Sequence, residues 1–313
     1  MTEKHPKPDW SEKCWKEMLV YQRKGMWLED TLHNFAAWMG LRPGMTAVDV
    51  GCGLGYLGYT FWKYFGDGGH YIGVDNAPEL IDEAREAALD WAVGGKATFH
   101  VAGAYNLPFA DDSVDWAMCQ TLLMHLERPD AALAEMKRIL KPGGLITCFE
   151  PDNYRPSLGK FYNSMPELTI EEHLLATKVL IIMHKGRIML GCGDDGIGPK
   201  VPRMLKLLGM VDIEARTNDR SHYLEPPYDS PLQQHALEQL KRQLLDEKRY
   251  QTIAALQKKQ FLAAGGDPDD YQRYRTTVDR QMTIFREQIE AGEYYTCSSG
   301  GFLYAVRARK PSE

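Results

Sequence analysis

The sequence lacks the patterns that mark a membrane-spanning or secreted protein. Its longest run of apolar residues, VLIIM, covers only residues 179–183, whereas a helix that crosses a bilayer needs about 20. The first residues are charged and contain proline, without the apolar stretch of a signal peptide. We therefore expect a cytoplasmic protein that does not enter a membrane.

Closely spaced cysteine pairs are also lacking. None of the six cysteines forms a Cys-x-x-Cys pair, the spacing typical of structural zinc sites and redox motifs. Cys52, Cys119 and Cys148 lie in or beside apolar stretches that predict strands, where a thiol packs as a small apolar group. The sequence thus predicts reduced cysteines and no bound metal.

An excess of positive charge is missing as well. The chain has 37 Lys and Arg against 43 Asp and Glu, a formal net charge of −6. Proteins that bind nucleic acid usually carry a basic surface. We expect no nucleic-acid partner, although a local basic groove would be compatible with this composition, which gives no indication of an oligomeric state.

What the chain does contain is a glycine-rich stretch at residues 46–58, TAVDVGCGLGYLG. A β-branched run followed by four glycines predicts a buried strand, a tight turn and a helix. Glycine lets the backbone adopt positive φ and approach a ligand closely, and the amides at a helix start favour anionic groups. Asp75 follows at the distance where a nucleoside-binding fold places an acid on a ribose. The pattern predicts a nucleoside-containing cofactor but does not say which one.

Strands and helices alternate through the first half of the chain. We expect strands at residues 46–50, 70–75, 97–101, 114–119 and 145–149, with helices between them. This alternation predicts an α/β fold with a parallel sheet, whose ligands bind beyond the carboxyl ends of the strands. Those ends carry Gly51, Asp75, Gly103, Gln120 and Glu150.

The rest of the chain is mostly helical by its periodicity. Two more strands are expected at residues 211–215 and 302–308, separated by a helical stretch over residues 230–292. Apolar residues at intervals of three and four between Tyr271 and Ile289 form a stripe that we interpret as packing rather than a binding surface.

Four segments together resemble the class I S-adenosylmethionine-dependent methyltransferases, in particular the small-molecule group that includes the ubiquinone and menaquinone C-methyltransferases. They are VDVGCGLGYLG, GVDNAPELI, LPFADDSVDWAMCQTLLMHL and EMKRILKPGGLI. The resemblance implies a Rossmann-like sheet of seven mostly parallel strands, an antiparallel last strand, helices on both faces and helical cap insertions. It also implies S-adenosyl-L-methionine as the cofactor.

On this resemblance the chain divides into six segments. They are an N-terminal helical lid at 1–39, a cofactor-binding core at 40–150, a helical insertion at 151–196, a continuation of the core at 197–219, a helical cap insertion at 220–300, and a final core strand and tail at 301–313.

The resemblance also assigns cofactor contacts by position. The methionine end would be held by Asp49, Gly51, Cys52, Gly53, Gly55 and Gln120, the ribose by Asp75, and the adenine by Asn76, Ala77, Ala104 and Tyr105. One departure is Gly103, which stands where many relatives have an Asp that binds the adenine amino group. A backbone carbonyl or Asn106 would have to replace that contact.

Methyl transfer needs a general base only if the acceptor loses a proton. His125 and Glu150 are the candidates, each with a structural alternative: a packed histidine, and a carboxylate bound to backbone amides. Tyr21, Trp27, His173 and His184 are candidates for contacts with the acceptor from a lid, with packing or solvent exposure as the alternative.

The favoured function is methyl transfer to a small molecule in a covered crevice, the acceptor atom being O, N, C or S. A methyltransferase that acts on protein or RNA, a nicotinamide-dependent oxidoreductase and a non-catalytic S-adenosylmethionine-binding protein are the alternatives. A helical region before the first strand and the LPFADDSVD and KPGG segments do not fit the oxidoreductase.

Overall fold

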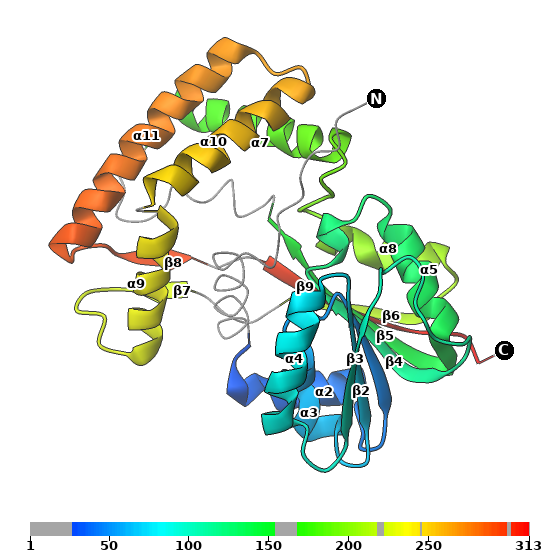
Figure 1. Ribbon diagram of the computed structural model, residues 1–313. Coiled ribbons are helices and arrows are strands. Elements are labelled where there is room, and N and C mark those ends of the chain that lie inside the picture. The colour runs from blue at the N-terminus through cyan, green and yellow to red at the C-terminus, as the bar shows by residue number, and fades with distance from the viewer. Residues whose placement is uncertain (1–26, 154–167, 218–221, 245, 299–301, 313) are drawn as a thin grey trace. The chain divides into compact units, whose positions relative to one another are not determined.

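The computed structural model describes residues 27–153, 168–217, 222–244, 246–298 and 302–312 (Figure 1). The chain separates into two compact units. The first comprises residues 1–151, 196–219 and 303–313, and the second comprises residues 152–195 and 220–302.

The first unit is built on a seven-stranded sheet with the strand order β3-β2-β1-β4-β5-β9-β6. Its strands are β1 (Thr46–Val50), β2 (His70–Asp75), β3 (Lys96–Val101), β4 (Val114–Gln120), β5 (Leu140–Asp152), β6 (Val211–Thr217) and β9 (Phe302–Arg309). The pairs β1–β2, β1–β4, β2–β3 and β4–β5 are parallel, and β6 pairs antiparallel with β9. The predicted Rossmann-like, mostly parallel sheet is confirmed.

Helices cover both faces of this sheet (Figure 1). On one face α2 (Glu29–Met39), α3 (Tyr56–Phe65) and α4 (Pro78–Trp91) bury apolar side chains against alternate strand residues such as Ala47 and Trp116. On the other face, two helices pack on the intervening residues such as Val48 and Ala117: α5 (Pro129–Ile139) and α8 (Val201–Leu207). A short 3₁₀ helix, η2 (Gly198–Lys200), precedes α8. Because both faces are covered, most residues of the central strands are apolar; Asp49, Gln120 and Glu150 are buried exceptions.

The second unit contains α7 (Ile170–Met189), α9 (Pro231–Leu244), α10 (Glu247–Ala263) and α11 (Pro268–Ala291). The apolar stripe of α11 is divided between two cores: Tyr271, Tyr274 and Val278 pack with α7 and α10, whereas Phe285 and Ile289 pack near α9. The stripe is thus a packing surface, as expected. None of the described helices combines the length and apolar character that membrane crossing needs.

Two features differ from the expectations. The region expected to be a purely helical cap also contains a small sheet of β7 (His222–Leu224) and β8 (Thr296–Ser298), whose strands are too short for periodicity to reveal. In addition, β5 begins at Leu140, which pairs with Val114, so the KPGG segment forms an irregular part of the strand instead of a separating turn. The lid and cap roles of the helical segments remain predictions.

Candidate functional site

The glycine loop joins β1 to α3 through three left-handed residues. Gly51, Gly53 and Gly55 have φ values of +71°, +52° and +77°, a region that other residues rarely adopt. The N–H groups of Gly51 and Cys52 donate to the carbonyl of Val74 at 2.7 and 3.0 Å. These bonds fix the loop to the end of the neighbouring strand β2.

Asp75, the last residue of β2, holds the same loop through its side chain. One carboxylate oxygen accepts the N–H of Gly53 at 2.9 Å and the other accepts the N–H of Ala77 at 3.0 Å. Burial raises the pKa of Asp75 above its ordinary value, although the backbone bonds oppose this shift. Each oxygen has a second lone pair, so this carboxylate can organise the loop and still accept hydrogen bonds from a ligand.

The loop has one packed side and one open side. A methyl group on Gly53 would meet no heavy atom within 4 Å, and the same holds for Gly103. By contrast, a methyl group on Gly51 would lie 2.7 Å from Leu122 Cδ1. The backbone at Gly53 and Gly103 is therefore accessible to a ligand, while Gly51 provides close packing.

Asp49 and Cys52 are buried beside this loop, at 1% and 8% exposure. The hydroxyl of Tyr71 donates to Asp49 Oδ2 at 2.7 Å. Burial, followed by the nearby charges of Asp49 and Asp75, raises the pKa of the Cys52 thiol well above its ordinary value. Cys52 is consequently a neutral packing residue and not a reactive thiolate.

The end of β4 and the turn after it also belong to the candidate site. Gln120 is buried, and Thr121 adopts a left-handed conformation with φ +48°, which turns the chain into the short 3₁₀ helix η1 (Leu123–His125). The side chain of Leu122 then lies against Gly51. This contact links the end of β4 to the glycine loop.

Glu150, near the end of β5, holds the same turn. Its side chain is fully buried. One oxygen accepts the N–H groups of Leu122 and Leu123 at 2.9 and 2.8 Å, and the other accepts that of Met124 at 3.2 Å. This geometry supports the structural alternative, a carboxylate bound to backbone amides; a role as general base remains a prediction.

His125 completes η1 and is half-buried. Its N–H donates to the carbonyl of Leu122 at 2.9 Å, so its backbone is fixed by the turn that Glu150 holds. The imidazole is therefore carried by a rigid element, which suits a catalytic histidine and a packed one equally.

The predicted adenine contacts lie on two neighbouring loops. Asn76 is exposed and Ala77 half-buried after β2, while Ala104 and Tyr105 follow β3. The Tyr105 hydroxyl accepts the N–H of Arg128 at 3.2 Å, and the Arg128 guanidinium lies over the tyrosine ring at 5.1 Å from its centroid. A cation–π contact of this kind steadies an exposed ring.

The predicted lid residues differ in their surroundings. Trp27 packs edge-on against Phe35, Phe61 and Phe149, with centroid distances of 5.4, 5.2 and 5.1 Å. These contacts support the packing interpretation of Trp27. Tyr21 lies outside the described residues.

His173 and His184 both lie on α7, in the second unit. His184 Nδ1 is 2.6 Å from Asp195 Oδ1, and Nε2 is 3.4 Å from Asp194 Oδ1. Burial raises the pKa of Asp195, but the bond to His184 and the charge of Arg187 outweigh this and lower it overall. Ligand atoms of the three residues lie within 4.8 Å of one another, and the hydrogen bond between His184 and Asp195 holds this group together.

Sequence reasoning missed the residues that join the strand ends. Tyr71, Leu122 and Arg128 bind or pack against predicted site residues. Their partners are distant in sequence, so spacing gives no signal for them. A buried-strand tyrosine such as Tyr71 was the one detectable hint, because a buried hydroxyl needs a partner.

Residues 48–148 match the family described as methyltransferase domain. An uncharacterized methyltransferase of Schizosaccharomyces pombe is 40% identical over 110 residues, covering 34% of this chain and 39% of its own length. The ubiquinone/menaquinone biosynthesis C-methyltransferase of Vibrio campbellii is 35% identical over 111 residues, 36% of this chain and 43% of its own. The demethylmenaquinone methyltransferase of Staphylococcus aureus is 33% identical over 144 residues, 46% and 56%. The chain thus spans about half or less of these relatives.

Solved structures share the fold. A putative methyltransferase from Bacillus halodurans aligns with a TM-score of 0.50 at 17% identity, covering 90% of this chain and 98% of its own. The [4+2]-cyclase SpnF aligns equally well, with a TM-score of 0.50 at 17% identity, covering 91% and 82%. Because a cyclase is among them, the fold alone does not decide the reaction.

Proposed function

Since residues 48–148 belong to the methyltransferase domain family, we propose that this chain transfers a methyl group from S-adenosylmethionine to a small-molecule acceptor. The observation that carries the proposal is the open face of the glycine loop beside Asp75: Gly53 leaves space for a ligand while its N–H is held by that carboxylate.

The residues of this loop suit the cofactor chemically. The two oxygens of one carboxylate match a pair of adjacent ribose hydroxyls, and Asp75 presents both oxygens from a fixed position. Gly51, Gly53, Gly55, Cys52, Asp49 and Gln120 would hold the methionine end, and Asn76, Ala77, Ala104 and Tyr105 would lie along the adenine.

S-Adenosylmethionine, when bound, supplies a methyl group that its sulfonium has already activated. The protein then has to orient the acceptor and exclude water. If the acceptor is a hydroxyl or a carbon acid, His125 would accept its proton, and Glu150 would keep the turn that carries His125 in position.

A small acceptor is supported by the names of the relatives and by charge. One similar protein is named as a ubiquinone/menaquinone biosynthesis C-methyltransferase and another as a demethylmenaquinone methyltransferase. The net charge of −6 gives no general attraction for nucleic acid. The acceptor screen should therefore begin with quinols and continue with small hydroxyl, amine and thiol compounds.

Isothermal titration calorimetry with S-adenosylmethionine, S-adenosylhomocysteine and NADH tests the cofactor. We expect the first two to bind and NADH not to bind. Asp75→Asn should weaken the binding of S-adenosylhomocysteine at least roughly tenfold, because charge-assisted hydrogen bonds are lost. Asp90→Asn, at an exposed position on α4, removes the same charge away from the site and should bind like wild type.

The outcomes separate the alternatives. Binding of NADH alone would contradict the proposal at its centre, and unchanged affinity in Asp75→Asn would exclude Asp75 as a ribose ligand. Transfer of labelled methyl to protein or RNA, with none to small molecules, would favour a macromolecular acceptor. Cofactor binding without any transfer would favour a non-catalytic protein.

A further inference from the structure

A polar cavity lies in the first unit, at the amino ends of the parallel strands and thus opposite the glycine loop. It has a volume of about 90 Å³ and is lined by the segment that precedes β1, the starts of β4 and β5 and the end of β9. A cavity needs about 10–15 Å³, measured in the same way, to hold one water molecule. The space is therefore large enough for one small polyatomic ion.

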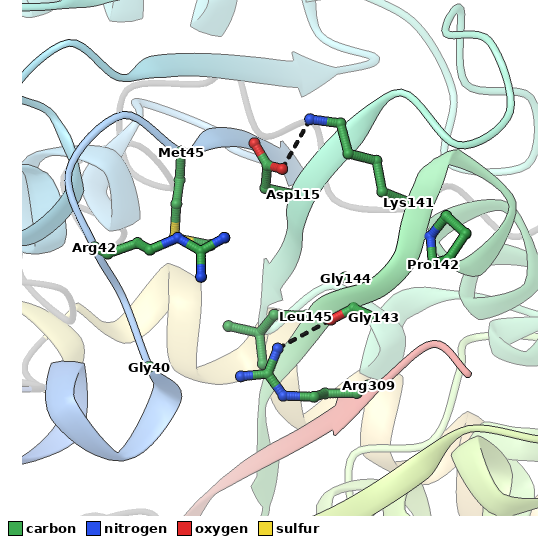
Figure 2. A pocket seen from close by; sticks show the side chains of 10 residues that line it. All are labelled: Gly40, Arg42, Met45, Asp115, Lys141, Pro142, Gly143, Gly144, Leu145 and Arg309. Carbon is green, nitrogen blue, oxygen red and sulfur yellow. Dashed lines mark hydrogen bonds and ion pairs between the residues drawn. The ribbon is translucent and has the colours of Figure 1, made fainter. Parts of the chain in front are cut away.

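Cationic side chains dominate this cavity. Figure 2 shows Arg42 reaching in from one side and Arg309 from the other, with Lys141 and Asp115 at the rim. Lys141 pairs with Asp115 Oδ1 at 2.8 Å, while the N–H of Thr46 donates to Asp115 Oδ2 at 2.9 Å. The single carboxylate is thus already neutralised.

Neither guanidinium group forms an ion pair among the described residues. Arg309 donates to the carbonyl of Gly143 at 3.0 Å. Arg42 is exposed, and its charge acts on Asp115: burial raises the pKa of that carboxyl, but the bonds from Lys141 and Thr46 and the charges of Lys141 and Arg42 lower it overall. Two arginines of like charge facing one cavity repel each other, unless an anion lies between them. This arrangement is unexpected in a chain whose net charge is −6.

From this geometry we propose that the cavity binds a small oxyanion, a phosphate or carboxylate group, between Arg42 and Arg309. Guanidinium groups form paired hydrogen bonds with both kinds of group. The site lies at the amino ends of the parallel strands, away from the cofactor loop at their carboxyl ends, so an anion bound here would act as a stabilising or regulatory ligand and not as a substrate.

The test is calorimetry of the full chain with inorganic phosphate and, separately, acetate, with the ionic strength held constant with sodium chloride. We expect at least one of the two anions to bind at a single site. The anion that binds more tightly identifies the recognised group as phosphate or carboxylate. Arg42→Gln should weaken this binding at least about tenfold. Because Arg42 is exposed and its interaction with Asp115 is only a charge–charge one, this variant should fold like wild type.

Arg203→Gln is the matched control. Arg203 is exposed on α8 in the same unit and does not line the cavity, so its loss should leave the affinity unchanged. Equal affinity in wild type and Arg42→Gln, or no binding of either anion to wild type at tens of millimolar, would overturn the proposal. Neither result bears on S-adenosylmethionine binding, which is measured without these anions.

Discussion

Replacing Glu150 by glutamine tests whether this buried acid positions η1 or takes part in the chemistry. The carboxylate accepts three backbone N–H groups, two on one oxygen and one on the other. In Glu150→Gln the amide oxygen can still accept from Leu122 and Leu123. The amide NH₂ then faces the N–H of Met124, so one acceptor is replaced by a donor.

The expected loss follows from that count. Glu150→Gln loses the charge-assisted hydrogen bond to the Met124 N–H and places a second donor against that N–H, which should lower the free energy of unfolding by about 1–3 kcal/mol. Glu150→Ala removes the acceptor for all three amides, and the Leu123 bond is fully buried, so we expect about 3–5 kcal/mol. Glu127→Gln, at an exposed position two residues beyond His125, should change stability by less than about 0.5 kcal/mol.

Tryptophan fluorescence during urea unfolding is the appropriate assay, because every tryptophan among the described residues precedes residue 117 and lies in the first unit. The pH–rate profile then separates the two roles. A positioning residue lowers the rate without changing the shape of the profile, whereas loss of a general base removes its acid limb. Unchanged stability together with a lost acid limb would refute the positioning argument.

Two further predictions concern a buried carboxyl and a helix contact. Burial raises the pKa of Asp75, so its ionisation destabilises the native state as the pH rises from about 4 through the raised pKa. The free energy of unfolding of Asp75→Asn, relative to that of wild type, should therefore increase between about pH 4 and 7 in urea titrations. A decrease would contradict this prediction. In the second unit a methyl group on Gly186 of α7 would lie 1.6 Å from the Gln260 carbonyl of α10. Gly186→Ala should therefore lower the urea midpoint measured by circular dichroism, by the equivalent of about 1–3 kcal/mol. The unfolding transition measured by tryptophan fluorescence should stay unchanged. Lys185→Ala, on the exposed side of α7, is its control, and a shift as large in this variant would exclude the close contact as the cause.

Local signals were sufficient to predict where the strands of the first unit lie. The β-branched run at Thr46–Val50 and the glycines after it specify a strand and a turn by steric preference alone, and the structure has β1 at those residues. The number of strands and the antiparallel β9 came from the family resemblance. Strand order was not predicted, because neighbouring strands such as β1 and β4 are about 70 residues apart and periodicity does not reveal their pairing.

The candidate site was less predictable, because its contacts join residues that are distant in sequence. Glycine spacing indicated the loop, but not that Leu122 would pack on Gly51 or that Arg128 would hold Tyr105. The pairing of His184 with Asp195 also escaped prediction, since each residue alone has many plausible surroundings. Such pairs depend on tertiary packing, which single-residue preferences do not encode.

Asp75 and Glu150 show why strand-end carboxylates are hard to classify from sequence. Each lies at or near the carboxyl end of a parallel strand, and each accepts backbone N–H groups from a neighbouring loop. They differ in whether a ligand can reach the carboxylate. Glu150 is fully buried and accepts three backbone N–H groups, whereas Asp75 is partly exposed and accepts two. A ligand can therefore reach Asp75 without breaking the loop, while using Glu150 as a base would release the turn that carries His125. This difference is the physical reason for giving Asp75 the binding role and Glu150 the positioning one.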